Sequence, residues 1–471
     1  MSSILREIVE RRKVALREQS LPEPVERTVN SKTFVEQLAQ GCPTPAGLIL
    51  ECKKASPSKG VMVENYQPEA IAKVYEPYAS AISVLTEPDY FKGSLEHLRA
   101  VRDVVDQPLL CKDFIIDEKQ IDAAKLTGAN IILLMLSVLN GERYKKLKDY
   151  AESKGLETIT EVIDEQEVER AVSGGAKIIG INNRNLHTLE TDLINTEKLA
   201  PLIPDDRLII AESGIYTRSD LLRLAPHVDG FLIGSSMMQS SSLKMAVRKL
   251  LFGDFKICGL TNAEDLQKVS ELGAAYAGII LTDKSKRYVS LDDAESWTHE
   301  AKIPLVGVFM NQTIEFIVEA SERLKLSVIQ LHGDESQEFI NNLSEQIPDC
   351  RIWKALTVNP QTAQSESAVA DAVNEQRAKF DETTIERFLI DTPKTSSSNN
   401  QLNLNGLLSD SKLLLAGARS IDDSIYQNPK LQAGIDLCSA VECQPGQKDP
   451  NLLSQLFANL IPKTRKHHDR K

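Results

Sequence analysis

The chain has 471 residues and a formal net charge of −12, from 55 Lys and Arg against 67 Asp and Glu. Half of that length, about 235 residues, is the size of one α/β barrel, so the length predicts two domains. Hydrophobic residues make up 42% and charged residues 26% of the sequence, a composition that excludes disordered and fibrous proteins. The acidic balance argues against a broad nucleic-acid-binding face, so any bound phosphate must be held locally.

The cysteines and the apolar runs of the sequence predict the cellular compartment of the protein. The seven cysteines are odd in number and have no paired spacing, unlike a disulfide framework or a zinc site. Charged residues among the first 20 leave no apolar signal-peptide core. The longest apolar stretch, Ile131 to Leu136, is far shorter than the roughly 18 residues of a membrane span. We expect a cytoplasmic monomer that contacts neither membranes nor nucleic acid.

Residues 1–45 are predicted to form a helical extension. Leu5, Ile8 and Val9 recur at helical spacing among charged residues, until two prolines interrupt the pattern. We expect this extension to cap another part of the molecule.

Sixteen short apolar runs follow, and nearly every one precedes a stretch long enough for a helix. In the first half they begin at Leu48, Ala81, Leu109, Ile131, Leu156, Lys177, Leu208 and Gly230. In the second half they begin at Phe255, Tyr276, Pro304, Ser327, Arg351, Arg387, Lys412 and Ala433. Continuous rather than alternating apolar residues are typical of parallel strands buried on both faces.

This repeat predicts two consecutive (β/α)8 TIM barrels, residues 1–253 and 254–462. A doubly wound open sheet has the same alternation of strands and helices, so the count of eight is the argument for closure. Residues 246–252 read as the last helix of the first barrel, and the polar stretches 361–381 and 395–405 as loop insertions. Residues 463–471 form a basic tail that we expect to be a solvated chain end.

Charged and polar residues directly follow the apolar runs of the first half. They are Glu51, Lys53, Lys112, Glu161, Asn182, Arg184 and Glu212. Barrel enzymes place catalytic side chains at the carboxyl ends of their strands. Buried charges must compensate one another, so this set predicts either a site for a polar ligand or, less favoured, a structural ring of ion pairs.

Two lysines beside carboxylates can divide acid and base catalysis between them. After the seventh run come Ser213 and Gly214, and after the eighth come Gly234 and Ser235. Barrels often bind phosphate through these two loops, with backbone N–H groups and a helix N-terminus.

Four motifs of the first half resemble indole-3-glycerol-phosphate synthase over about residues 1 to 252. They are ECKKASPSKG (51–60), LTE (85–87), CKDF (111–114) and GINNRNL (180–186). The resemblance implies ring closure of 1-(2-carboxyphenylamino)-1-deoxyribulose 5-phosphate, with loss of carbon dioxide and water. By that resemblance Lys112 is the general acid at the carbonyl, and Glu161 serves the later dehydration together with Lys53.

The resemblance also implies roles for the other residues of this set. Glu51 and Glu212 would orient the lysines, and the phosphate would be held by Ser213, Gly214, Gly234 and Ser235. The remaining substrate-binding residues would be Asn182, Arg184, Ser58, Phe91 and Phe114, with the two phenylalanines as an apolar wall.

The second half carries fewer charged residues at its strand ends. Its titratable residues there are Cys258, Arg287, His332, Lys354, Asp391 and Asp436. A buried cysteine alone is usually a small hydrophobic residue. At the carboxyl end of a barrel strand, however, the Cys258 thiolate could act as a base, with Asp391 as the complementary acid.

Six motifs of this half resemble phosphoribosylanthranilate isomerase over about residues 254 to 461. They are KICGLT (256–261), VGVF (306–309), QLHG (330–333), WKA (353–355), FLID (388–391) and DLCSAVE (436–442). The resemblance implies an Amadori rearrangement of N-(5-phosphoribosyl)anthranilate. Asp391 would protonate the furanose ring oxygen, and Cys258 would remove the C2 proton. Gly417 and Ser439 would bind phosphate and Arg287 the anthranilate, while His332 would support the pocket.

Three segments depart from the isomerase pattern. Residues 416–419 read AGAR, which places a methyl group near the expected phosphate site, and 284–287 read KSKR instead of the family's Ser-Pro-Arg. The loop 392–398 lacks the family's glycines. These departures leave open that the second barrel is a structural or binding module.

The leading hypothesis is a bifunctional enzyme of tryptophan biosynthesis in which the second barrel makes the substrate of the first. A pair of phosphosugar isomerases or aldolases is the alternative enzyme class. The sequence contains no metal-ligand spacing and no dinucleotide or P-loop fingerprint, so we expect no metal and no cofactor.

Overall fold

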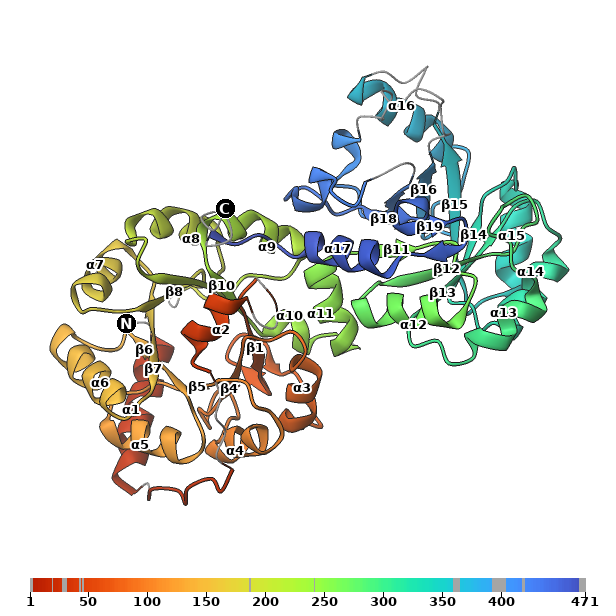
Figure 1. Ribbon diagram of the computed structural model, residues 1–471. Coiled ribbons are helices and arrows are strands. Elements are labelled where there is room, and N and C mark those ends of the chain that lie inside the picture. Colours follow the sequence, from red (N-terminus) through yellow and green to blue (C-terminus); the bar gives the residue numbers. More distant parts are fainter. Residues whose placement is uncertain are drawn as a thin grey trace. The chain divides into compact units, whose positions relative to one another are not determined.

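The computed structural model describes residues 3–18, 20–27, 32–41, 44, 46–185, 188–240, 242–358, 365–391, 404–416 and 420–465. They divide into two compact units, one made of the chain up to Leu250 together with residues 461–465, and one of Leu251–Leu460. Each unit is built around a closed barrel (Figure 1).

The barrel of the first unit has eight parallel strands in the closed order β1-β10-β9-β8-β7-β6-β5-β4. They are β1 (Leu48–Cys52), β4 (Ala81–Leu85), β5 (Leu109–Lys112), β6 (Ile131–Met135), β7 (Glu157–Val162), β8 (Ile178–Asn182), β9 (Leu208–Glu212) and β10 (Gly230–Ile233). Each begins within one residue of its predicted start, so the prediction of a closed eight-stranded barrel is confirmed.

Helices follow the strands on the outside of this barrel (Figure 1). They are α3 (Pro68–Tyr75), α4 (Leu95–Val104), α5 (Glu118–Leu126), α6 (Gly141–Ser153), α7 (Glu165–Ser173), α8 (Ile194–Leu199), α9 (Arg218–Leu224), α10 (Ser235–Met238) and α11 (Leu243–Phe252). Several begin at a capping side chain: Asp117, Asp164 and Thr217 accept backbone N–H groups at the starts of α5, α7 and α9, which satisfies donors that the helix leaves unpaired.

The N-terminal extension contains the helices α1 (Ser3–Glu18) and α2 (Phe34–Gln40). Phe34 of α2 is fully buried in the barrel core. The Glu157 carboxylate, at the start of β7, accepts the backbone N–H groups of Phe34 and Val35. α2 therefore closes the barrel at the amino ends of its strands. A short hairpin, β2 (Ala55–Ser56) with β3 (Gly60–Val61), lies between β1 and α3 and was not predicted.

The second unit repeats the architecture in the closed order β11 to β18. Its strands are β11 (Phe255–Ile257), β12 (Tyr276–Ile280), β13 (Leu305–Phe309), β14 (Val328–Leu331), β15 (Arg351–Thr357), β16 (Arg387–Asp391), β17 (Leu413–Leu415) and β18 (Gly434–Leu437). Its helices are α12 (Ala263–Leu272), α13 (Leu291–Thr298), α14 (Ile314–Arg323), α15 (Gln337–Gln346), α16 (Glu366–Arg377) and α17 (Pro450–Leu460). A small hairpin, β19 (Glu442–Gln444) with β20 (Gln447–Lys448), follows β18.

Three expectations about connecting segments are wrong. Residues 366–377, expected in a loop insertion, form α16, because Ser365 caps the helix and Val369 and Val373 are buried. After β17, the described residues 420–433 contain only the 3-10 turn η4 (Ser424–Gln427) where a helix was expected. The expectation of a solvated tail is wrong for its first residues. Thr464 is buried, and Arg465 forms an ion pair with Asp229 of the first unit.

None of the helices among the described residues is both long enough and apolar enough to cross a membrane.

Candidate active sites

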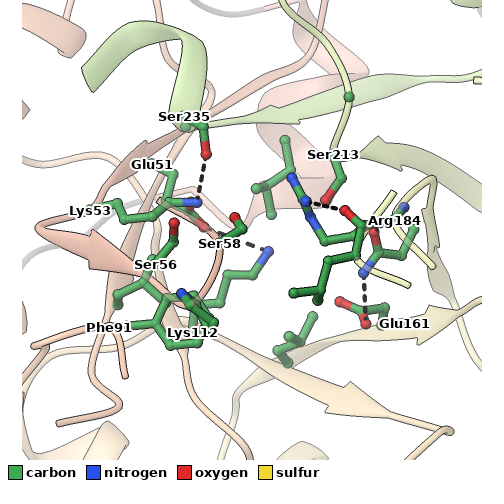
Figure 2. Close-up of a pocket in the computed structure, with 18 of the residues that line it drawn as sticks. Glu51, Lys53, Ser56, Ser58, Phe91, Lys112, Glu161, Arg184, Ser213 and Ser235 are labelled. Atoms are coloured by element: carbon green, nitrogen blue, oxygen red, sulfur yellow. Dashed lines mark hydrogen bonds and ion pairs between the residues drawn. The ribbon is translucent and has the colours of Figure 1, made fainter. Parts of the chain in front are cut away.

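The charged residues predicted at the first barrel's strand ends, apart from Glu212, line one cavity (Figure 2). Its lining includes Glu51, Lys53, Ser58, Phe91, Lys112, Phe114, Glu161, Asn182, Arg184, Ser213, Gly214, Gly234 and Ser235. Strand register explains this convergence, since Leu85 pairs with Lys112, Met135 with Glu161 and Asn182 with Glu212. All of these positions lie at the carboxyl ends of strands, where barrel enzymes have their sites.

An alternating chain of charges runs across this cavity. Lys53 Nζ lies 2.6 Å from Glu51 Oε1, and Lys112 Nζ lies 3.6 Å from Glu51 Oε2 and 2.9 Å from Glu212 Oε2. Glu51 and Glu212 are buried. Glu212 is absent from the cavity lining and reaches the site through Lys112. Each buried carboxylate therefore has an ammonium partner, as buried charges require.

These partners set the protonation states of the site. Burial alone would raise the pKa of Glu51, but Lys53 and Lys112 lower it below its usual value. Burial alone would lower the pKa of Lys112, but the carboxylates of Glu212 and Glu51 raise it. Lys112 is therefore a stable ammonium. Burial and the Glu212 charge raise the pKa of Glu161 to about 8, so this carboxyl holds a proton at neutral pH.

Glu161 belongs to a second hydrogen-bonded group in the same cavity. Asn182 Nδ2 donates to Glu161 Oε1 at 3.1 Å, and the backbone N–H of Arg184 donates to Asn182 Oδ1 at 2.9 Å. Arg184 Nη1 donates to the Leu189 carbonyl at 2.7 Å. The amide of Asn182 thus fixes both the carboxyl and the start of the segment that carries Arg184.

Phe91 and Phe114 form an apolar wall, with ring centroids 6.2 Å apart. Buried Glu87 holds the loop that carries Phe91 by accepting the backbone N–H groups of Asp89, Tyr90 and Phe91. A flat aromatic ligand suits such a wall.

Ser213 and Ser235, one from each predicted phosphate loop, both lie in the upper part of the view in Figure 2. Ser213 and Gly214 have positive φ angles of 65° and 77°. The Lys53 ammonium donates to Ser235 Oγ at 3.2 Å. A Cβ atom at Gly234 would overlap the Glu51 carboxylate, so packing against Glu51 alone already requires a glycine at this position.

Sequence reasoning missed the contribution of α1 to this cavity. Ile4, Leu5 and Ile8 line it, and buried Arg12 forms an ion pair with Asp113, the residue after Lys112. The helical spacing of Leu5 and Ile8 was the available signal, but it did not reveal which surface they cover.

The second barrel gathers Cys258, Arg287, Asp391 and Ser439 around another cavity. His332, Gln330, Asp436 and Cys438 also line it. Gly417 and the departures at 417–419 and 392–398 lie outside the described residues.

The surroundings of Cys258 favour a thiolate. A hydrogen bond with Cys438 and the Lys256 ammonium hold the pKa of Cys258 well below its usual value, although burial opposes them. Cys258 itself is buried, at 6% exposure. A buried cysteine with a lowered pKa is suited to act as a base.

Asp391 and Arg287 have protein partners. His332 Nε2 lies 3.2 Å from Asp391 Oδ2, which agrees with a supporting role for the imidazole. Arg287 Nε and Nη2 both donate to Glu442, at 2.9 and 2.6 Å. Lys448 Nζ also donates to Glu442, at 2.8 Å. Sequence reasoning did not assign a role to Glu442 or Lys448, whose hairpin follows the last strand.

No group of three or more His, Cys, Asp or Glu side chains that could hold a metal ion occurs within the part of the chain that the structure describes.

Comparison with known proteins assigns both halves to families. Residues 3–250 match the family described as indole-3-glycerol phosphate synthase, and residues 255–459 match the family described as N-(5'phosphoribosyl)anthranilate (PRA) isomerase. The tryptophan biosynthesis protein TrpCF of Haemophilus influenzae is 44% identical over 442 residues, which cover 92% of this chain and 90% of that protein. TrpCF of Yersinia pestis is 41% identical over 467 residues, with 97% and 94% covered.

Two closed barrels, two cavities at strand ends and these matches over most of the chain agree with one another. The chain belongs to the TrpCF family of bifunctional tryptophan biosynthesis enzymes, which join an indole-3-glycerol phosphate synthase domain to a phosphoribosylanthranilate isomerase domain.

Proposed function

We propose that Lys112 is the general acid of the synthase barrel. Its ammonium is held by Glu212 and Glu51 and would protonate the carbonyl oxygen of 1-(2-carboxyphenylamino)-1-deoxyribulose 5-phosphate. Protonation makes the carbonyl carbon electrophilic, so that the aromatic ring can attack it. The ring carbon that attacks is the one that carries the carboxylate, and loss of carbon dioxide from it then restores the aromaticity of the ring.

Glu161 and Lys53 serve the dehydration that follows. One gives a proton to the departing hydroxyl group while the other removes a proton from the new ring. The pKa of Glu161, raised to about 8 by burial and by Glu212, is close to neutral pH, which suits a group that exchanges protons during turnover.

The rest of the cavity binds the substrate. Ser213, Gly214, Gly234 and Ser235 take the phosphate, supported by their position in the loops after β9 and β10. Phe91 and Phe114 cover the anthranilate ring, and Asn182, Arg184 and Ser58 supply polar contacts.

In the isomerase barrel, Asp391 protonates the furanose oxygen of N-(5-phosphoribosyl)anthranilate as the C1–O bond breaks. The nitrogen lone pair forms the C=N bond of an iminium ion. The Cys258 thiolate then removes the C2 proton, and the C2–H electron pair gives an enolamine that becomes the ketone product. Arg287, fixed by Glu442, binds the anthranilate carboxylate, and Ser439 and Gly417 bind phosphate.

The observation that carries this assignment is the separate gathering of acid and base groups in each barrel. We expect Lys112→Ala to abolish indole-3-glycerol phosphate formation while isomerisation persists, and Cys258→Ala to do the reverse. Each activity is assayed with its own phosphorylated substrate. Loss of both activities from either single change, in a folded protein, would refute independent sites.

We further propose that the chain works as a monomer in the cytoplasm. Each cavity draws its lining from its own barrel, and seven scattered cysteines suit a reducing compartment. Sedimentation equilibrium of the active enzyme tests the monomer, and a stable dimer would contradict it.

A further inference from the structure

A buried ion pair lies one layer below the thiol of Cys258. Lys256 of β11 is fully buried, and its Nζ lies 2.8 Å from Oδ2 of buried Asp436 on β18. The two residues are direct neighbours in the β11–β18 register. Lys256 and Cys258 are two residues apart, a spacing that puts both side chains on the barrel's inner face.

The glycine at 278 brings the lysine and the thiol into one space. A Cβ atom at Gly278 of β12 would lie 2.8 Å from Cys258 Sγ and 2.9 Å from Lys256 Cε. Both side chains therefore pack against the same stretch of backbone, which has room for them only because it carries no side chain.

Charged and titratable groups surround the thiol on several elements. Lys256 comes from β11, Asp436 and Cys438 from β18 and its end, Glu442 and Lys448 from the hairpin, Arg287 from the loop after β12, His332 from the end of β14 and Asp391 from β16. Lys448 Nζ donates to the carbonyl oxygens of Cys258 and Cys438, at 2.6 and 3.3 Å, and so fixes backbone. The stem of Lys256 packs beside the thiol itself, at Gly278.

We propose that Lys256, held in place by Asp436, is a positioning residue that keeps Cys258 in the thiolate form needed for isomerisation. The inference rests on the proposed role of Cys258 as base. The influences on both groups agree with it. A hydrogen bond with Cys438 and, next to it, the Lys256 ammonium lower the pKa of Cys258. Burial, with a contribution from Cys258, raises the pKa of Asp436 to about 6. The effect of two coupled charges is mutual, so Asp436 must oppose the thiolate.

Two substitutions with opposite expected effects test the proposal. The readout is thiolate absorbance near 240 nm against pH in the full chain, taken as the difference from Cys258→Ser so that the other cysteines cancel. We expect Lys256→Met to move the midpoint up by about one pH unit or more, and Asp436→Asn to move it down. Arg387→Met, which removes the ion-pair partner of Asp254 at the opposite end of the barrel, should leave it unchanged.

Kinetics provide the second readout. In Lys256→Met, the acidic limb of the isomerase pH profile should move with the midpoint. At pH below the new midpoint, kcat should fall about tenfold for each pH unit by which the midpoint has risen, with KM little changed and synthase activity intact. If Lys256→Met does not fold, Lys256→Gln, which also removes the charge, should move the midpoint up in the same way, and an unmoved midpoint in that variant would overturn the proposal.

Unchanged midpoints in folded Lys256→Met and Asp436→Asn, or midpoints that move in the same direction, would overturn the proposal. Full isomerase activity in Cys258→Ser would instead refute the role of Cys258 itself. An inactive Cys258→Ser with unmoved midpoints would overturn only the part assigned to Lys256.

Discussion

At the scale of single residues, Glu161 combines a catalytic role with a cost in stability. The residue is 3% exposed, and burial together with the Glu212 charge raises the pKa of its carboxyl to about 8, against roughly 4.3 in an unfolded chain. Because the folded pKa is the higher one, this group favours folding at low pH. That contribution is complete below roughly pH 4.3 and is lost as the pH rises toward 8.

Glu161→Gln should therefore stabilise the first barrel and inactivate it. The glutamine oxygen can still accept from Asn182, and no charge is buried. We expect the free energy of unfolding to exceed that of the parent at about pH 9, with a smaller gain at about pH 5, and synthase activity to fall by about a hundredfold or more. Urea titrations at the two pH values check the first point. A gain equal at both would mean that packing, rather than charge, is responsible.

The sequence predicted individual strand-end residues well and their partners poorly. Lys112, Glu161 and Asn182 were identified because each directly follows or ends a buried run, which is local information. The contact between Arg12 and Asp113 joins residues 101 positions apart. Many arginines could have met that carboxylate, so only the three-dimensional packing of α1 identifies the one that does.

At the scale of elements, α1 is a wall of the synthase cavity held by one buried ion pair. The Asp113 carboxylate accepts hydrogen bonds from the Arg12 guanidinium, from Thr86 Oγ1 and from the backbone N–H of Phe114. Arg12→Met would leave a buried carboxylate with fewer donors, which costs about 3 kcal/mol when a buried pair is broken. Because Leu5 and Ile8 line the cavity, a loosened α1 should also raise KM.

We expect KM for the synthase substrate to rise severalfold in Arg12→Met, with a smaller change in kcat because Lys112 keeps Glu212. Lys13→Met is the matched control: its exposed pair with Glu10 is on the same helix, and its loss should alter neither KM nor stability. Steady-state kinetics and thermal unfolding of the two variants measure both effects. Equal behaviour of the two would exclude the buried pair as the anchor of α1.

Elements with continuous apolar runs were predicted closely, and irregular ones were not. All sixteen barrel strands begin within one residue of their expected starts, because burial on both faces leaves a distinct pattern. α16 was missed because only Val369 and Val373 of its 12 residues are buried, too few to show a helical period. The hairpin β2–β3 has two residues in each strand, which is too short for any alternation.

At the scale of the whole molecule, the eight apolar runs counted in each half of the chain were enough to predict closure of both barrels. The path of the chain after the second barrel was not predictable, because the basic composition of residues 463–471 resembles any solvated terminus. Arg465 in fact donates to the Asp229 carboxylate at 2.9 Å and to the Arg207 carbonyl at 2.6 Å, and its backbone N–H donates to the Val228 carbonyl. Residues 461–465 thus belong to the first unit.

Truncation should therefore weaken the synthase barrel, although the deleted residues come after the isomerase. A chain ending at Leu460 loses the partner of Asp229, which is buried at 4% exposure, and the buried Thr464. We expect the first unit to lose about 2 kcal/mol of unfolding free energy, so synthase activity should disappear at lower urea concentration while the isomerase midpoint stays unchanged. A chain ending at Arg465 retains these contacts and should match the parent. Identical synthase midpoints for the two truncated chains would show that Arg465 contributes nothing to the fold of the first barrel.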